Sequence, residues 1–188
     1  MPVDVERIEF LTTELLRAIG EDPGTPELKD TPRRVAHAWR EFIDYDPGNH
    51  ETTFESVTAN QMVVVSGMRV WSYCAHHLIP FWTDISIGYL TGHKVLGLSK
   101  FGRISQLCAH RLQLQERLVE QISDEVERLT ETPHVAVLAV GEHLCMVSRG
   151  IKLPSRMVSS SLKGAFREEP DARAEFYKLV EMSTRRTG

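Results

Sequence analysis

Two segments far apart in the chain carry side chains that bind the same kind of metal ion. One contains Cys74-Ala75-His76-His77, and the other contains His143-Leu144-Cys145. Cysteine thiolates and imidazoles are the ligands that zinc prefers, so Cys74, His77 and Cys145 are candidate ligands. Three protein ligands leave one tetrahedral position open to water, as in catalytic rather than structural zinc sites. A fold that forms this site must bring the two segments together.

The alternatives to a catalytic metal site differ in strength. The Cys74-x-x-His77 pair alone is a weak signal, because a buried cysteine beside surface histidines is the simpler explanation. The second segment, at the end of a predicted strand, shifts the balance towards metal. Structural zinc remains the alternative, although it usually takes four protein ligands. Cys108 lies between Leu107 and Ala109 on a predicted helix, and we expect it to pack in the core.

The composition is that of an ordinary globular protein. The 188 residues are 41% hydrophobic and 26% charged, which fits one domain or one domain with a helical appendage. A net charge of -4 argues against general nucleic-acid binding. The 3 cysteines cannot form a complete disulfide framework, and reduced thiolates suit the cytosol. With no signal-peptide pattern and no apolar run of about 18 residues, we expect a cytoplasmic protein without a membrane partner.

The hydrophobic pattern divides the chain into an N-terminal helical segment (1–48), a linker (49–60) and a catalytic body (61–188). A pair of helices is expected over 4–19 and from Asp30 through Phe42. In the body the pattern predicts strands at 62–65, 68–71, 81–90, 95–98, 135–140 and 147–161, and helices at 100–110, 114–129 and 171–182. This order indicates an α+β fold with helices on one face of an antiparallel sheet.

Two histidines beside the candidate ligands could transfer protons. Successive residues of a strand point to opposite faces, so His76 and His77 cannot both bind one ion if their segment is extended. With His77 as the ligand, His76 is free to act as acid or base, because the ordinary histidine pKa is about 6.5. A purely structural hydrogen bond of His76 is an equally good explanation. His143 is the corresponding histidine beside Cys145.

Two further motifs suit an anionic, planar substrate. Ser99 is a plausible N-cap, and Lys100 and Arg103 would place two cations near the same helix N-terminus, where a phosphate can bind. Solvated surface cations are the commoner outcome for such pairs. Gln115-Glu116 begins the next helix, where the helix dipole alone favours a carboxylate. The functional alternative is that Glu116 accepts two hydrogen bonds from an amidine-like edge such as that of guanine.

Together these segments resemble the GTP cyclohydrolase I family. The resemblance runs from Asp30-Thr31-Pro32-Arg33-Arg34-Val35 to Glu175-Phe176. It includes four ordered blocks: Cys74-x-His76-His77, Gly97-Leu98-Ser99-Lys100-x-x-Arg103, Gln113-x-Gln115-Glu116-Arg117-Leu118 and His143-x-Cys145-x-x-x-Arg149-Gly150. Four blocks in order are far more specific than any one of them.

The resemblance implies a fold and a reaction. The fold is the tunnelling fold, here expected as a four-stranded antiparallel sheet with helices on one face, assembled as a decamer of two pentamers. The reaction converts GTP and water to 7,8-dihydroneopterin triphosphate and formate, the first step of folate or pterin biosynthesis. It uses one Zn²⁺ per subunit, which Cys74, His77 and Cys145 would hold.

The resemblance also implies roles for the remaining residues. His76 would protonate the ring nitrogen that leaves C8 of the purine, His143 would serve the ribose opening, and Ser99 the sugar rearrangement. Glu116, with Gln115, would read the guanine edge. The triphosphate would bind to Lys100, Arg103 and Arg149, some of them from a neighbouring subunit.

The sequence departs from the family pattern at Ala75, where the family usually has Glu. This change removes a negative charge beside the metal site, and such changes often cost about ten- to a hundredfold in metal affinity or activity. Leu112 replaces a usual Pro, and Ser159-Ser160-Ser161 replaces a Thr-rich run. The alternative is therefore a divergent tunnelling-fold paralogue that binds a purine nucleotide and stops at a ring-opened intermediate, or that is not catalytic.

Overall fold

The computed structural model describes residues 2–184, which form two compact units, one up to Asp46 and one from Pro47. The N-terminal unit pairs α1 (Val5–Ala18) with α2 (Thr31–Ile43). The carboxylate of Asp4 accepts a hydrogen bond from the Arg7 backbone N–H at 2.9 Å and caps α1. Pro32 lies in the first turn of α2, where its missing N–H has no helical partner to lose.

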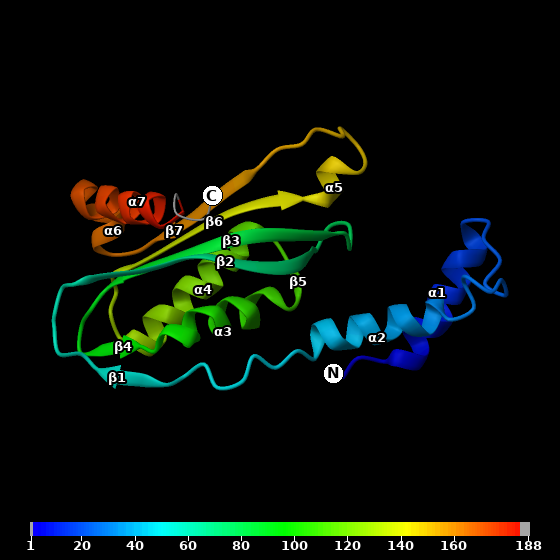
Figure 1. Ribbon diagram of the computed structural model, residues 1–188, viewed down its shortest axis with the longest axis horizontal. Helices are drawn as coiled ribbons and strands as arrows, with labels where there is room; N and C mark the ends of the chain where they lie inside the picture. The colour runs from blue at the N-terminus through cyan, green and yellow to red at the C-terminus, as the bar shows by residue number, and fades with distance from the viewer. Residues whose placement is uncertain (1, 185–188) are drawn as a thin grey trace. The chain divides into compact units, whose positions relative to one another are not determined.

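A five-stranded sheet forms the centre of the second unit (Figure 1). Its order is β5 (Leu112–Gln113), β2 (Met62–Cys74), β3 (Pro80–Leu90), β6 (Val135–His143) and β7 (Met157–Leu162). The four longer strands are antiparallel to their neighbours, whereas β5 runs parallel to β2. The α+β class is confirmed, but the expected four-stranded antiparallel sheet is wrong because the sheet has five strands and is mixed. β5, with two residues, is too short to leave a period in the sequence.

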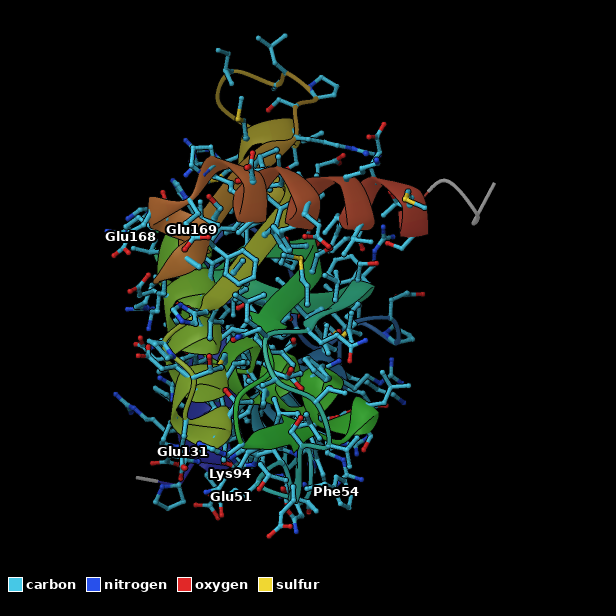
Figure 2. The ribbon with its side chains drawn as sticks, turned by 90° about the vertical axis from the view of Figure 1, so that its left-hand side faces the viewer. Glu51, Phe54, Lys94, Glu131, Glu168 and Glu169 are labelled. Carbon is cyan, nitrogen blue, oxygen red and sulfur yellow. The ribbon has the colours of Figure 1, made fainter. Side chains whose placement is uncertain are left out.

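Helices cover both faces of this sheet, so the expectation of helices on one face is also wrong. One face packs against α3 (Leu98–Ala109) and α4 (Gln115–Thr130), through a core that includes Ile85, Ile87 and Val137. The other face packs against α6 (Ala165–Glu168) and α7 (Pro170–Thr184), as Figures 1 and 2 show.

The second core is centred on Phe176, which is fully buried. A β-carbon at Gly88 would lie 2.6 Å from the Phe176 ring, so the glycine makes room for α7 on the sheet. Burial of one such phenylalanine contributes about 1.5–3 kcal/mol. The strands carry apolar residues towards both faces, and this two-sided burial is why a simple alternating pattern did not reveal the second helical layer.

The stretch expected as a linker contains a short strand, β1 (Thr53–Glu55), which pairs with β4 (Lys94–Leu96) in a separate two-stranded sheet. Lys94 forms an ion pair with Glu131 at the end of α4 (Figure 2). These contacts hold the start of α3 against the end of α4. Within residues 2–184, no helix combines the length and the apolar content needed to cross a bilayer.

Two local predictions were wrong. Ser99 does not cap α3, because the cap position is Gly97 and Ser99 lies inside the first turn. The strand expected over 147–161 is instead a four-residue helix, α5 (Leu144–Val147), an irregular stretch, and β7. Ile151 and Leu153 suggested a strand, yet they are 65% and 54% exposed.

Candidate metal centre and active site

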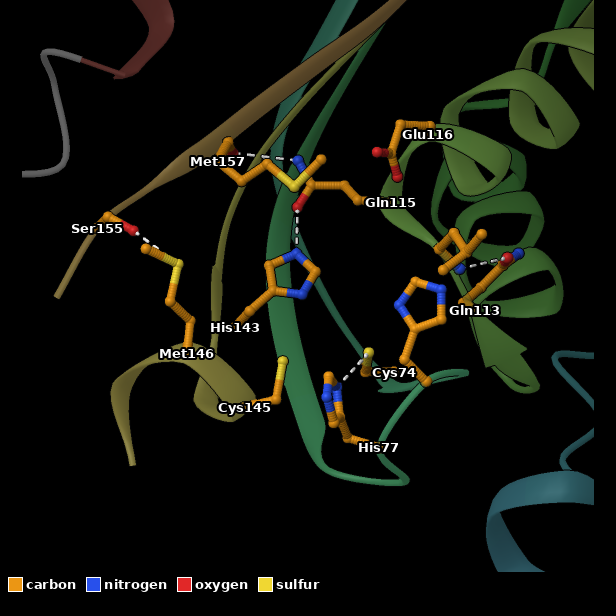
Figure 3. Close-up of a pocket in the computed structure, with 12 residues that line it drawn as sticks. Cys74, His77, Gln113, Gln115, Glu116, His143, Cys145, Met146, Ser155 and Met157 are labelled. Atoms are coloured by element: carbon orange, nitrogen blue, oxygen red, sulfur yellow. Dashed lines mark hydrogen bonds between the residues drawn. The ribbon is translucent and has the colours of Figure 1, made fainter. Parts of the chain in front are cut away.

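Three side chains from the ends of two strands converge on one point. Cys74 is the last residue of β2, His77 lies in the turn that follows, and Cys145 lies on α5 just after β6. Their Sγ and ring-nitrogen atoms all lie within 4.8 Å of one another (Figure 3). The Sγ of Cys74 lies 3.7 Å from Nδ1 of His77. These three residues are the ligands expected from the sequence, and they could hold a metal ion.

The turn between β2 and β3 brings His77 back towards Cys74. The backbone carbonyl of Cys74 accepts hydrogen bonds from His77 N at 3.2 Å and from Leu78 N at 2.9 Å. Leu78 adopts a left-handed conformation with φ of 55°, which is unusual for a residue with a β-carbon. The segment is therefore a tight turn and not the extended strand considered above. The rings of His76 and His77 are nearly perpendicular, with centroids 6.1 Å apart.

The chemistry of the three donors fits a soft divalent cation. Burial raises the pKa of the Cys145 thiol, and the neighbouring Cys74 raises it further, because two thiolates this close repel each other. A bound cation would remove this repulsion and favour both thiolates, which are the forms that bind metal. Cys108, in contrast, is in the core as expected, and burial raises its pKa to about 12.

A second group of possible ligands already has a cation. His50, Glu51 and Glu125 also place donor atoms within 4.8 Å of one another. The guanidinium of Arg128, however, donates to Glu125 at 2.7 Å and to Glu51 at 3.0 Å. The bond to Arg128 is the main cause that lowers the pKa of Glu125. This group is an ion-pair network, with the arginine in place of a metal.

The metal-ligand group opens into a pocket of about 290 Å³. The pocket is lined by Cys74, His76, His77, Gln113, Leu114, Gln115, Glu116, His143, Cys145, Met146, Ser155 and Met157 (Figure 3). It therefore brings together seven residues singled out in the sequence: three candidate ligands, His76, His143, Gln115 and Glu116. The volume is at the lower limit of small-molecule sites.

His143 is held in the wall of the pocket by two contacts. Its ring stacks on Phe81, with centroids 4.4 Å apart and planes 6° apart. Its Nε2 lies 3.0 Å from Oε1 of Gln115. Burial lowers the pKa of His143, and the nearby Glu116 opposes part of this shift. The neutral imidazole is thus the favoured form in the folded protein.

Glu116 and Gln115 differ in their availability to a ligand. Glu116 lies in the first turn of α4 and its carboxylate is exposed at the pocket. Gln115 is fully buried, and its amide nitrogen lies within 3.2 Å of three acceptors in β6 and β7. Glu116 can therefore reach a bound base, whereas the amide of Gln115 is engaged inside the protein.

The other predicted residues do not line the pocket. The Lys100 ammonium and the Arg103 guanidinium both donate to the backbone carbonyl of Asn49, at 2.7 and 3.0 Å. With Ser99 they lie at the start of α3, beside β4 and at the end of the sheet away from α5 (Figure 1). Arg149 follows α5 and is close enough to Cys145 to lower the pKa of that thiol. One chain thus separates two predicted cations from the metal-ligand group.

The structure adds residues to the site that the sequence did not single out. Phe81 supports His143 from β3, directly opposite it in the sheet register. Met146, Ser155 and Met157 form one wall of the pocket. Only the cross-strand pairing identifies Phe81, and no pattern in the sequence gives that pairing.

Comparison with known proteins points to one family. Residues 8–181 match the family described as GTP cyclohydrolase I. The chain is 41% identical over 182 residues to GTP cyclohydrolase 1 of Hyperthermus butylicus, covering 96% of this chain and 93% of the relative. It is 42% identical to GTP cyclohydrolase 1 of Deinococcus radiodurans, covering 98% and 88%. It is 40% identical to that of Aquifex aeolicus, covering 96% and 98%.

The match extends over both units of the structure and includes every residue of the pocket. The chain therefore belongs to the GTP cyclohydrolase I family of enzymes.

Proposed function

We propose that this protein converts GTP and water to 7,8-dihydroneopterin triphosphate and formate, as the first step of a folate or pterin pathway in the cytoplasm. The observation that carries the proposal is the convergence, around one pocket, of three metal-binding side chains, two histidines and a carboxylate. The names of the relatives support the same reaction.

We assign one zinc ion per subunit to Cys74, His77 and Cys145. The Cys2His donor set and the absence of a fourth protein ligand among the described residues of the group support a catalytic site. A zinc ion bound there lowers the pKa of its water to about 7 and so supplies a nucleophile at neutral pH.

The protein side chains orient the purine and move protons. Glu116 accepts hydrogen bonds from the N–H groups of the guanine edge and fixes the base in the pocket. His76 gives a proton to the ring nitrogen that leaves C8. His143 takes and returns a proton during opening of the ribose. Each histidine suits this role because its ordinary pKa lies near neutral pH.

The triphosphate requires cations that one chain does not bring to its own pocket. We propose that Ser99, Lys100 and Arg103 reach the pocket of a neighbouring copy, whereas Arg149 serves its own. Open strand edges support assembly: among the described residues, β7 pairs only with β6, and β2 pairs with β5 only at its last two residues. Edges of this kind are usually covered by another chain. A decamer of two pentamers is the assembly that we propose.

The test is incubation of zinc-loaded protein with GTP, with formate and the pterin chromophore measured together. Both products should appear in equal amounts. Cys145→Ala should lose both products and its zinc, measured by elemental analysis. Cys108→Ala is the matched control, because Cys108 lies in the core away from the pocket and should keep both. A zinc-loaded protein that leaves GTP unchanged would contradict the proposal.

The second candidate is an enzyme that opens the purine ring and stops. Ala75 favours it, because this residue lies between the ligands Cys74 and His77 and carries no charge. In the same assay this enzyme would consume GTP without releasing formate, so the two candidates are distinguished by formate alone.

A further inference from the structure

The orientation of the Gln115 amide is fixed by its surroundings. One end of the amide lies 3.2 Å from the backbone carbonyl of Ala139 and 3.1 Å from that of Met157. Carbonyl oxygens only accept hydrogen bonds, so this end must be the NH2 group. It also lies 3.1 Å from the hydroxyl oxygen of Ser159. The opposite end, facing His143, is therefore the oxygen.

This orientation determines which nitrogen of His143 carries hydrogen. The oxygen of Gln115 can only accept, and Nε2 of His143 lies 3.0 Å from it, so Nε2 must be the donor. In a neutral imidazole the other nitrogen, Nδ1, then has a free electron pair. Figure 3 shows that this nitrogen faces the side of the pocket where Cys74 and His77 lie.

The ring cannot easily choose another orientation. The stack on Phe81 fixes its plane, and Phe81 is itself fully buried. A rotation of the ring by 180° in that plane-preserving sense would place Cε1, which cannot donate a normal hydrogen bond, where Nε2 now meets Gln115. The hydrogen bond therefore selects one of the two ring orientations that the stack allows.

We propose that Gln115 is a positioning residue, which holds His143 as the Nε2–H tautomer and thereby presents Nδ1 as the proton acceptor of the pocket. Its catalytic meaning rests on the function proposed above. A proton taken from a substrate O–H forms an N–H bond at Nδ1, while Nε2 keeps its own hydrogen on Gln115. The resulting charge on the imidazole is balanced by the oxyanion until the proton is returned. This role replaces the expected reading of guanine by Gln115.

Neutron crystallography of the zinc-loaded protein tests the tautomer directly. The crystals would be exchanged into heavy water at about pH 8, well above the ordinary histidine pKa of about 6.5. We expect a deuteron on Nε2 between His143 and Gln115, two on the Gln115 nitrogen, and none on Nδ1. A deuteron on Nδ1, with or without one on Nε2, would overturn the proposal.

Kinetics of Gln115→Met tests the role in catalysis. A residue that acts through His143 should lower kcat by about ten- to a hundredfold and leave the KM for GTP within about threefold, as is usual for the support of an active-site group. A residue that reads the base would raise KM instead, and that result would contradict the proposal. Glu116→Gln provides this second pattern for comparison.

The control variant is Gln106→Met. Gln106 makes the same kind of contact, Oε1 to Nε2 of His110 at 3.0 Å, but on α3 and away from the pocket. It should leave kcat and KM unchanged. If the wild type does not turn over GTP, the proposed function fails while the neutron result still decides the tautomer. If GTP is turned over and Nδ1 carries the deuteron, only the positioning role fails.

Discussion

Gly141 and Gln115 approach each other so closely that no side chain fits between them. A β-carbon at Gly141 would lie 2.8 Å from Oε1 of Gln115, and the backbone oxygen of Trp82 would be closer still, at 2.5 Å. Gly141 lies on β6 two residues before His143, so the strand that presents the histidine also makes room for the amide that holds it.

Gly141→Ala should therefore destabilise the protein and disturb His143 together. Overpacking of this kind costs about 1–3 kcal/mol in the free energy of unfolding, and urea denaturation would measure the loss. We expect kcat to fall as well, because the Gln115 oxygen must move. Gly102→Ala is the matched control: it lies on α3 with no atom within 4 Å of the added carbon. Ala there should stabilise by about 0.5–1 kcal/mol. Equal effects of the two substitutions would contradict the close approach.

The lowered pKa of His143 predicts how stability depends on pH. Below about pH 6.5 the unfolded chain binds a proton at this histidine, whereas the folded chain resists it because burial lowers the pKa. Stability should thus decrease as pH falls below about 6.5 and until it passes the folded pKa. The check is urea denaturation of metal-free wild type and His143→Gln between about pH 7.5 and 5.5. The variant should lose less stability over this range; parallel curves would show that His143 does not contribute.

A site completed by two copies predicts complementation between inactive variants. Lys100→Ala should lose triphosphate binding and Cys145→Ala should lose metal, so each variant alone should be inactive. Co-expressed chains would assemble at random, and about a quarter of the pockets would receive both intact parts through a heterologous interface. Activity near this fraction of wild type is the expected result. Mixed assemblies no more active than either variant would mean that both residues serve one chain's pocket.

Ala75→Glu tests the departure from the family pattern. Ala75 is exposed in the turn, and its backbone N–H donates to the Gln113 carbonyl at 3.0 Å, so a longer side chain fits without repacking. A carboxylate beside the ligands should raise zinc affinity or kcat/KM by up to about tenfold. Ala75→Gln has nearly the same shape without the charge and is the control. If both substitutions act alike, charge is not what the position lacks.

The metal-ligand group could be predicted because its signal is chemical. Few residue types bind zinc, and Cys74, His77 and Cys145 combine them in two short segments. The sequence also placed Glu116 and His143 at element ends, where side chains commonly reach a pocket. These inferences needed residue types and strand ends but no knowledge of which strands pair.

Features that depend on pairing could not be predicted. The burial of Gln115 follows from its position under β6 and β7, and a glutamine in a polar motif suggests a surface contact instead. The helical layer of α6 and α7 packs on strands whose apolar residues face both ways, which the pattern alone does not assign to partners. Ile151 and Leu153 suggested a strand because apolar residues usually pack within one chain, whereas here they are exposed.

The ligand residues lie on strands that are not neighbours, because β3 separates β2 from β6 in the sheet. An ion held by Cys74 and Cys145 would join two strands that exchange no backbone hydrogen bonds. It would act as a cross-brace over the first residues of β3 and would close a loop whose closure the unfolded chain resists. Because only the folded chain forms this group, binding adds RT ln(1 + [metal]/Kd) to stability. The rigidity of this edge, and the lifetime of the enzyme, would then follow the zinc supply of the cell.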